Sequence, residues 1–513
     1  MQRTFPLNDP ETFLWYDFET YGSDPATTRI AQCAAIRTDA TCTQILEEQV
    51  WYCRAVPDFL PDPVACAVTG LTPPLVNARD DALTEPAFAA QLLRVLSQPG
   101  TCWVGYNNVR FDDACLRYLL HRNLLDPFAH ENRLDTSRWD LLDVLRLAYA
   151  FRPEGIEWPS RTDDPEAPSF KLEDLAAANA IAQPRAHDAR SDVLALIAHA
   201  NLVRTRQPRL FAYALGLRTP ARVDALLSAR APREPLWLIS PFVPASQGHL
   251  SPVVVLGKRP GRRNEWLTLD LREPVARFLE TPLETLHAWR FCPEVSLPES
   301  AYRSPVRTIS VKKTPMLANW AAIGATDPAR FGLDLDAIQS QFAVAQRYRD
   351  ALHEKAAALL ARGEAEFIGQ TRDPEIALYG EFPGGRDRSR LAAAWQAAPA
   401  TGPDAAAMQT LETALEQPTL RELAFRMRAR WYPESLSDDD ATRWTQLRCA
   451  RVCHGAAGAS LSRATFRERF AQAAAALSEE RRAELASWET EASAGCDCEA
   501  VASAATAFPP VEA

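Results

Sequence analysis

The sequence has no apolar run long enough to cross a membrane. None of its stretches reaches 18 apolar residues, whereas a membrane-spanning helix needs about 20. The first residues, Met1 to Asp9, also lack the basic segment and apolar segment of a secretory signal. We therefore expect a cytoplasmic protein without membrane association.

The chain is also poor in lysine. Only five of its 56 basic residues are lysine, at positions 171, 258, 312, 313 and 355. Arginine suits bidentate contacts with phosphate. However, the chain is rich in alanine and proline as well, so a general composition bias explains the preference better.

A second pair of ligands with the spacing of a zinc site is missing too. The eleven cysteines are scattered, and an odd number without a secretory signal indicates free thiols in a reducing compartment. Cys449, Cys453 and His454 lie close together, but no second pair of ligands has zinc spacing. Buried core cysteines are the favoured interpretation.

Length and charge suggest several domains with different tasks. A chain of 513 residues exceeds one hydrophobic core, which predicts two or three domains. Residues 1–203 carry 17 basic and 29 acidic side chains, whereas residues 204–365 carry 23 and 15. The basic middle is therefore either a surface for a polyanion or an ordinary solvated face.

Strand and helix signals alternate over the first 200 residues, which favours a mixed α/β fold. Short apolar strands between residues 231 and 275 then suggest a small barrel or sheet, and helical patterns dominate afterwards. Residues 491–513 are rich in alanine and serine and are expected to be disordered. The predicted strands are 13–19, 30–36, 49–53, 101–106, 236–239, 252–256 and 266–269. The predicted helical segments are 112–121, 139–150, 172–179, 188–204, 334–361, 421–430 and 466–488.

Acidic residues at three places carry the chemical signal. Asp17 and Glu19 lie two apart on a predicted strand, so both carboxylates project from one face. Asp112 begins a predicted helix, where it can be a simple N-cap. His187 precedes another helix, and Asp192 follows on its first turns. Each of these features alone is more often structural than functional.

Taken together and in this order, the five residues resemble the signature of the DEDDh exonuclease superfamily. Further segments narrow the resemblance to bacterial exonuclease I. It extends from about Phe13 to about Trp488, and it is most specific in the first 211 residues. The segments that carry it are Gly105–Asp113, Arg138–Asp143, Arg152–Ile156 and Thr205–Phe211.

This resemblance implies a three-domain fold. Residues 13–203 would form a ribonuclease-H-like α/β exonuclease domain, residues 204–365 a basic SH3-like domain that contacts DNA, and residues 366–490 a helical C-terminal domain. Family members of this kind form a C-shaped clamp around single-stranded DNA. The basic middle segment lies where such a clamp attracts phosphates.

The resemblance also implies a 3′→5′ exonuclease that degrades single-stranded DNA to 5′-mononucleotides, with a role in DNA repair and recombination. Asp17, Glu19 and Asp192 would bind two Mg²⁺ ions, for which Mn²⁺ can substitute, and Asp112 would position one ion or its waters. Two ions about 3.5–4 Å apart can clamp the attacking and leaving oxygens. His187 would take the proton of the attacking water.

Matching positions place Glu19, Arg117, Phe128, Arg146 and Lys171 beside the DNA. Phe128 is equally compatible with a base-stacking ring and with a core aromatic. Lysine stands at 171 where relatives carry arginine, and His130-Glu131-Asn132 lacks the expected aromatic residues. In the basic segment the densest group of cations, which either follows phosphates or is merely solvated, comprises Arg303, Arg307, Lys312 and Lys313.

The predicted partners are single-stranded DNA and the acidic, apolar C-terminal tail of single-stranded-DNA-binding protein, which Arg152 is placed to hold. A monomer is expected. Two alternatives are a 3′→5′ exoribonuclease of the same superfamily and a non-catalytic clamp, whereas a proofreading subunit lacks support because no partner-binding motif of that kind is evident. The long C-terminal part argues against the first, and the complete set of acidic residues argues against the second.

Overall fold

The computed structural model describes residues 10–131, 135–184, 186–230, 233–292, 296, 298, 301–365 and 372–496. The chain divides into two compact units. Unit 1 comprises Met1–Asp9, Ser137–Gln183 and Ala195–Gln370, and unit 2 comprises Pro10–Thr136, Pro184–Leu194 and Thr371–Ala513. The predicted domain boundaries and the clamp stay predictions. No helix in the described ranges is long and apolar enough to span a membrane.

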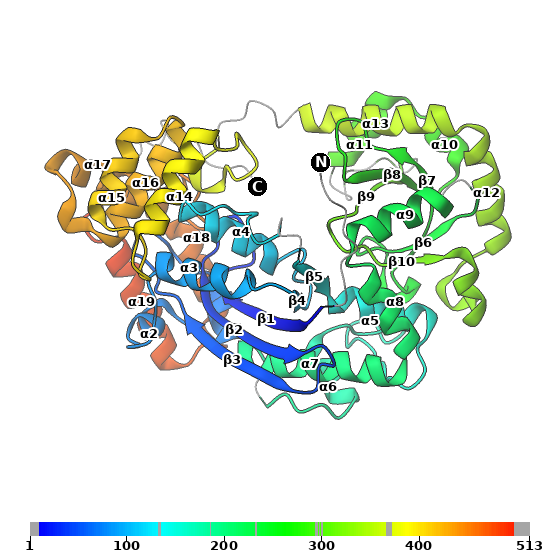
Figure 1. Ribbon diagram of the computed structural model, residues 1–513, viewed down its shortest axis with the longest axis horizontal. Helices are drawn as coiled ribbons and strands as arrows, with labels where there is room; N and C mark the ends of the chain where they lie inside the picture. Colours follow the sequence, from blue (N-terminus) through cyan, green and yellow to red (C-terminus); the bar gives the residue numbers. More distant parts are fainter. Residues whose placement is uncertain are drawn as a thin grey trace. The chain divides into compact units, whose positions relative to one another are not determined.

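Unit 2 contains the predicted N-terminal sheet, and its strands are hydrogen-bonded in the order β3-β2-β1-β4 (Figure 1). Strand β1 pairs antiparallel with β2 and parallel with β4. All four strands were predicted, with ends that differ by a few residues. Their bounds are β1 Thr12–Thr20, β2 Ile30–Asp39, β3 Ile45–Tyr52 and β4 Thr101–Gly105.

Helices α3 (Glu85–Leu96) and α4 (Asp112–Arg122) cover one face of this sheet (Figure 1). Tyr16 and Phe18 of β1 share a buried core with residues of both helices. Because side chains alternate along a strand, Asp17 and Glu19 face away from that core. The short helices α1 (Pro63–Thr69) and α2 (Pro73–Asn77) precede α3.

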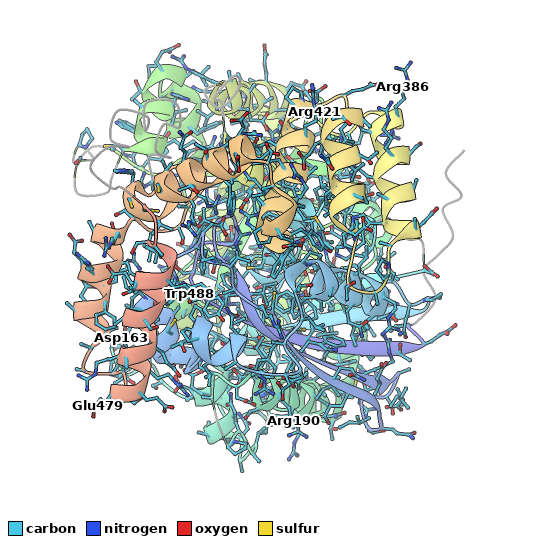
Figure 2. All side chains as sticks on the ribbon, turned by 90° about the vertical axis from the view of Figure 1, so that its left-hand side faces the viewer. Asp163, Arg190, Arg386, Arg421, Glu479 and Trp488 are labelled. Atoms are coloured by element: carbon cyan, nitrogen blue, oxygen red, sulfur yellow. The ribbon has the colours of Figure 1, made fainter. Side chains whose placement is uncertain are left out.

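The C-terminal helices belong to unit 2 as well. Trp488 lies inside, where its indole N–H donates to the carbonyl of Phe59 over 2.9 Å, whereas Arg386 and Glu479 point outward (Figure 2). The predicted helix over 466–488 is wrong, because Ser478 caps a new helix by accepting from the backbone N–H of Arg481. The helices are α14 Gly385–Ala397, α15 Ala405–Ala414, α16 Pro418–Trp431, α17 Asp438–His454, α18 Arg463–Ala473 and α19 Glu479–Ala492.

The last of these helices reaches Ala492, so the predicted disordered tail begins too early at 491. Its remaining residues from 497 onward lie outside the described part of the chain. Seven cysteines are buried free thiols as expected, namely Cys33, Cys42, Cys53, Cys66, Cys102, Cys115 and Cys449. Cys453 is disulfide-bonded, so the expectation of free thiols is wrong there.

Buried charges bind the C-terminal helices to the N-terminal part of unit 2. Glu375 of the short helix η5 (Pro374–Ile376) accepts from Arg29, which immediately precedes β2, over 2.7 Å, and it also pairs with Arg430 of α16. Arg430 donates in turn to Asp58. Each of these four side chains is at most 5 % exposed.

The described part of unit 1 starts at β5 (Ser137–Asp140). This unit holds a second sheet, ordered β10-β6-β7-β8-β9 (Figure 1). Three of its strands were predicted, whereas β9 and β10 were not. Helix α7 begins in unit 2 and continues into unit 1. The strands are β6 Leu236–Ile239, β7 Leu250–Lys258, β8 Glu265–Asp270, β9 Val306–Ser310 and β10 Leu317–Asn319. The helices are α5 Leu141–Phe151, α6 Leu172–Ala178, α7 Ala189–Arg206, α8 Pro208–Gly216, α9 Pro220–Arg230, α10 Val275–Glu280, α11 Leu283–Phe291, α12 Leu335–Arg347 and α13 Arg349–Ala365.

Candidate active site

Three predicted metal ligands meet in unit 2. Asp17, Glu19 and Asp192 each offer a carboxylate oxygen, and these three oxygens lie within 4.8 Å of one another. Strand β1 supplies the first two, and the first turn of α7 supplies the third. Within the described residues this is the one group of three or more potential ligands at such distances. Residues far apart in sequence therefore form one acidic cluster.

Asp112 lies beside this cluster. Its Oδ1 accepts a hydrogen bond from the backbone N–H of Phe18 over 3.2 Å, which places the first turn of α4 against β1 between the two acidic residues of the strand. The side chain is almost fully buried. Asp112 is thus more than a helix cap, since its carboxylate contacts the strand that carries Asp17 and Glu19.

Burial and mutual repulsion make the charged form of these carboxylates costly. Burial, together with the charge of Asp192, raises the pKa of Asp17 to about 7. Burial and the charges of Asp17, Asp192 and Asp188 raise the pKa of Glu19 to about 9. The pKa of Asp112 is also well above its usual range, because of burial and its neighbours Asp17 and Asp113.

Such a cluster fits a divalent cation. Carboxylates crowded in a buried site repel each other unless positive charge lies among them. Oxygen ligands of this kind suit hard cations better than they suit zinc, which prefers nitrogen and sulfur. The donor set and its raised pKa values therefore support metal binding by Asp17, Glu19 and Asp192.

His187 precedes α7, and its backbone is connected to the cluster. Its N–H donates to Oδ2 of Asp192 over 3.2 Å. The residue has a φ of 61°, in the left-handed region that histidine adopts more readily than most residues. The imidazole is exposed. The turn thus leaves this side chain open to solvent at the edge of the acidic cluster.

A polar network behind Asp112 was not predicted. The hydroxyl of Tyr16 donates to Oδ1 of Asp113, and the amide of Asn108 donates to that hydroxyl over 3.3 Å. Gly105 allows this approach, because a Cβ there would lie 2.5 Å from the Cβ of Asn108. The network holds the start of α4 against β1. The adjacent pair Asp112-Asp113 was the available sequence signal.

Two of the predicted DNA contacts lie in unit 2 next to each other. Arg117 of α4 is buried and donates to Oε1 of Glu131 over 2.6 Å. Its guanidinium lies 5.9 Å from the ring centre of Phe128. Phe128 is half-buried and contacts the rings of Tyr379 and Phe382. It is therefore neither a fully buried core residue nor an isolated surface ring.

Glu19 belongs to the acidic cluster, and the remaining two predicted contacts, Lys171 and Arg146, belong to unit 1. Lys171 is the exposed N-cap residue of α6. Arg146 donates to Asp143 over 2.9 Å, and its guanidinium lies 5.9 Å from the ring of Phe170. Arg146 thus lies near the ring of Phe170, and Lys171 is the next residue in the chain. Their contacts with DNA stay predictions.

Two arginines of the basic group in unit 1 are bonded to backbone carbonyls. Arg303 donates to the carbonyls of Trp289 and Cys292, and Arg307 donates to those of Ser304 and Val306. In the part of the chain that is described, neither arginine forms an ion pair. Lys312 offers its backbone carbonyl to Arg138 over 2.7 Å. Among the described residues, therefore, no carboxylate is paired with Arg303 or Arg307.

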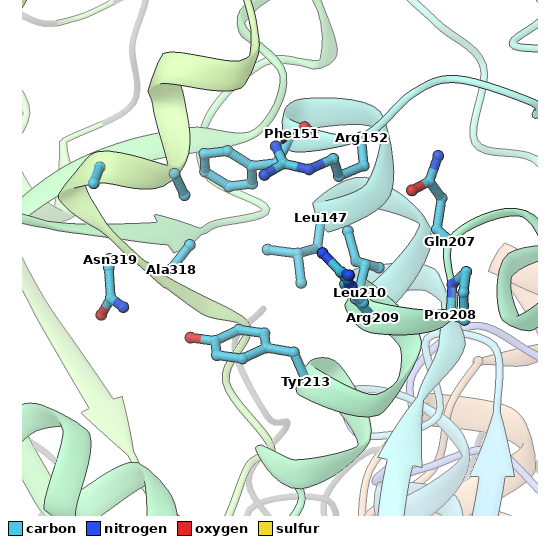
Figure 3. Close-up of a pocket in the computed structure, with 12 residues that line it drawn as sticks. Leu147, Phe151, Arg152, Gln207, Pro208, Arg209, Leu210, Tyr213, Ala318 and Asn319 are labelled. Carbon is cyan, nitrogen blue, oxygen red and sulfur yellow. Dashed lines mark hydrogen bonds between the residues drawn. The ribbon is translucent and has the colours of Figure 1, made fainter.

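An apolar pocket of about 570 Å³ opens beside Arg152 in unit 1 (Figure 3). Leu147, Phe151, Leu210 and Tyr213 line it, and Arg152 and Arg209 add positive charge. The hydroxyl of Tyr213 donates to the carbonyl of Leu317 over 2.8 Å, which orients that ring. The pocket combines an apolar floor with cationic groups.

The fold and the acidic cluster define a hydrolytic exonuclease. Residues 14–199 match the family model described as exonuclease. Residues 218–362 match the exonuclease I SH3-like domain, and residues 372–490 match the exonuclease I C-terminal domain. The three matches agree with the predicted sequence of an α/β domain, an SH3-like domain and a helical domain.

Known proteins are similar over most of this chain. Exodeoxyribonuclease I of Escherichia coli is 37 % identical over 437 residues, which cover 85 % of this chain and 89 % of the relative. The protein of the same name from Haemophilus influenzae is 34 % identical over 445 residues, covering 85 % and 90 %. The crystal structure of Escherichia coli exonuclease I with a dA16 oligonucleotide superimposes with a TM-score of 0.83 at 34 % identity, covering 93 % and 98 %. The chain belongs to the exonuclease I family, and the resemblance seen in its sequence is confirmed.

Proposed function

We propose that this exodeoxyribonuclease removes 5′-mononucleotides from the 3′ end of single-stranded DNA with the help of two Mg²⁺ ions. One observation carries the proposal, namely the convergence of Asp17, Glu19 and Asp192 within 4.8 Å of one another. The family assignment supports it, since the similar Escherichia coli enzyme was crystallised with a DNA oligonucleotide. The chain itself is a metal-dependent member of the exonuclease superfamily.

Each residue of the cluster has a separate role in this proposal. Asp17, Glu19 and Asp192 hold the ions, and Asp112 orients one ion or its waters from the start of α4. Bound divalent cations would stabilise the attacking and leaving oxygens of an in-line displacement. His187 accepts the proton of the attacking water, because its side chain is exposed at the edge of the cluster.

The choice of Mg²⁺ over other cations rests on ligand chemistry. Carboxylate oxygens and a phosphate substrate suit Mg²⁺, and Mn²⁺ accepts the same ligands. A zinc-bound form of the Escherichia coli enzyme with single-stranded DNA has also been solved. We infer that zinc can enter such a site but that Mg²⁺ is the working ion here.

The predicted substrate contacts keep their roles in this proposal. Glu19 contacts the terminal nucleotide next to the ions, and Lys171 is a further cation that binds the DNA. Arg117 and Arg146 attract the backbone, and Phe128 stacks on a base. Arg303, Arg307, Lys312 and Lys313 follow the phosphates farther from the end.

A protein partner fits the pocket beside Arg152. An SSB/exonuclease I structure in complex with an inhibitor has been solved, and it is similar to this chain. An acidic and apolar peptide tail matches a pocket that Leu147, Phe151 and Tyr213 line and that Arg152 and Arg209 make positive. We propose that this pocket holds the C-terminal tail of single-stranded-DNA-binding protein.

Digestion of end-labelled oligonucleotides tests the proposed reaction. Single-stranded and double-stranded DNA labelled at either end are incubated with Mg²⁺, Mn²⁺ or EDTA. We expect mononucleotide release from the 3′ end of single strands only, and none in EDTA. Release from the 5′ end, or in EDTA, would contradict the proposal. A cytoplasmic location, a monomeric state and a role in repair and recombination stay predictions.

A further inference from the structure

Gln32 is a buried polar residue of β2 that lies next to the acidic cluster. It is the direct antiparallel partner of Glu19 in β1, and Tyr52 of β3 is its partner on the other side. Residues that are paired across neighbouring strands present their side chains on the same face of a sheet. Gln32 is only 3 % exposed. Its amide is therefore enclosed on the face of the sheet from which Glu19 projects.

Both ends of this amide form hydrogen bonds. Nε2 of Gln32 donates to the hydroxyl of Tyr52 over 3.0 Å. Oε1 of Gln32 accepts from the backbone N–H of Ala189, the first residue of α7, over 3.4 Å. A side-chain amide has one donor end and one acceptor end, so the bond to Tyr52 turns the oxygen toward Ala189. Gln32 thus connects the sheet with the start of α7.

The backbone of Ala189 needs an acceptor from outside its helix. The first N–H groups of a helix have no acceptor within the helix itself. Ala189 is fully buried, so water cannot take the place of Gln32. The N–H of Ser191 is satisfied locally instead, by Oδ1 of Asp188 over 3.1 Å. Gln32 is thus the acceptor that the sheet supplies to the start of α7.

Two residues of the proposed mechanism depend on where this part of α7 lies. His187 precedes the helix, and Asp192 lies on its first turn. An ion pair between Arg190 and Glu48 of β3 also joins the turn to the sheet, but its side chains are 50 % and 31 % exposed. Exposed pairs of this kind contribute little. The buried bond from Gln32 is therefore the stronger of these two contacts.

We propose that Gln32 is a positioning residue, which holds the first turn of α7 so that Asp192 and His187 are placed correctly beside Glu19. This inference rests on the proposed function, and it adds a residue that acts through others. Gln32 links the two elements that supply metal ligands, because it lies next to Glu19 in the sheet and bonds the helix of Asp192. Partners that orient metal ligands from behind usually affect metal affinity or activity about 10–100-fold.

Gln32→Met tests the proposal, because methionine adapts to the space of the side chain but forms neither hydrogen bond. We expect kcat for the digestion of a thymidine oligonucleotide to fall about 10–100-fold. The Mg²⁺ concentration that gives half-maximal activity should rise. The affinity for the oligonucleotide in EDTA should stay unchanged, since Gln32 is buried and does not contact DNA in this proposal. A loss of affinity equal to the loss of kcat would show a general structural role and contradict positioning.

Hydrogen exchange in EDTA provides a measurement that needs neither metal nor turnover. A peptide that covers residues 187–194 should exchange faster in Gln32→Met than in the wild type, because the start of α7 opens more easily. Gln341→Met is the matched control. Oε1 of Gln341 accepts from the backbone N–H of Val275 over 2.8 Å, which is the same kind of bond at the start of α10 in unit 1. This control should leave kcat and the exchange of residues 187–194 unchanged.

Tyr52→Phe separates the orientation of the amide from the packing of Gln32. It removes only the hydroxyl that fixes the amide, so kcat should fall less than in Gln32→Met, and the Mg²⁺ requirement should shift in the same direction. The double variant Gln32→Met/Tyr52→Phe should be no less active than Gln32→Met, because the two residues act through one bond. Additive losses would show independent roles and contradict the proposal.

Wild-type kcat and wild-type exchange in Gln32→Met would overturn the positioning role and leave the proposed function intact. If Gln32→Met does not fold, Tyr52→Phe decides, and an unchanged kcat and Mg²⁺ requirement in that variant would overturn the role as well. If the wild type itself releases no nucleotides in Mg²⁺, the proposed function fails, and the positioning role fails with it.

Discussion

The backbone N–H of His187 donates to Oδ2 of Asp192 over 3.2 Å, so the predicted general base and a predicted metal ligand share one turn. The contact uses the main chain and leaves the imidazole exposed. A change of the His187 side chain can therefore leave Asp192 in place. The two roles can be separated by experiment.

His187→Asn should lower kcat by about 10²–10⁴-fold, the usual contribution of a general base. Asparagine tolerates the left-handed backbone at φ 61°, so the turn and its bond to Asp192 should survive. Metal-dependent stabilisation against heat should consequently be unchanged. Asp192→Asn should abolish both hydrolysis and this stabilisation. Full activity of His187→Asn would exclude the residue as the base.

The metal-free protein should become less stable as pH rises. The pKa of Asp17 is raised to about 7 and that of Glu19 to about 9, from ordinary values of 3.8 and 4.5. The folded state therefore binds more protons than the unfolded state between about pH 4 and 9. In this pH window the free energy of unfolding falls by about 1.4 kcal/mol per pH unit for each additional proton that the folded state binds.

Melting temperatures measured from pH 5 to 9, in EDTA and in Mg²⁺, check this linkage. Bound cations offset the carboxylate charges that protons neutralise at lower pH. The increase in melting temperature caused by Mg²⁺ should therefore become larger as pH rises. Asp17→Asn should flatten the pH dependence in EDTA. An equal melting temperature in EDTA at pH 5 and pH 8 would be incompatible with the raised pKa values.

Glu375→Ala should lower the free energy of unfolding by about 3–5 kcal/mol, because it leaves buried arginines without their partner. Burial opposes ionisation of this carboxyl, but the charges of Arg430, Arg451 and Arg29 hold its pKa well below the usual range. Its stabilising effect is thus present at neutral pH and is lost as pH falls below about 4.

Urea unfolding measures the change, and Arg386→Ala is the control. Arg386 pairs with Glu416 on the surface, where its side chain is 79 % exposed. Surface pairs contribute about 0–1 kcal/mol. Equal effects of the two substitutions would show that the buried charges do not stabilise unit 2.

Arg303→Ala/Arg307→Ala should reduce the slope of log K against log salt concentration by about 0.7 for each phosphate that the variant no longer neutralises. Neither arginine is neutralised by an ion pair among the described residues. Titration of an oligonucleotide at several salt concentrations gives the slope. Arg79→Ala/Arg161→Ala removes two arginines that are paired with Asp81 and Asp163, and its slope should match that of the wild type. An unchanged slope for the first variant would make Arg303 and Arg307 ordinary solvated residues.

Arg152→Ala should weaken binding of a synthetic acidic, apolar tail peptide by about 10- to 100-fold, the usual value of a charge-assisted hydrogen bond. Isothermal titration with the wild type and the variant measures this affinity. Digestion of free single-stranded DNA should be unaffected. Unaltered peptide binding would exclude the pocket beside Arg152 as the tail site.

Much of the fold could be read from local patterns. Strands β1, β2 and β4 and helices α4 and α7 were predicted because their periodicity and apolar content are strong. Strands β9 and β10 were missed because short strands carry little signal of their own. The segment from 466 to 488 was predicted as one helix because its composition is uniformly helical, whereas Ser478 begins a new helix by capping it.

The sequence by itself determined the chemistry. Residues two apart on a strand share a face, which placed Asp17 and Glu19 together. Their order with Asp112, His187 and Asp192 resembles the DEDDh signature, and this resemblance implied the acidic metal site. Only the tertiary structure decided that Phe128 meets Tyr379 and Phe382, and that Arg29, Asp58, Glu375 and Arg430 neutralise one another. These contacts join segments hundreds of residues apart. No local pattern encodes them, since they arise when packing brings the segments together.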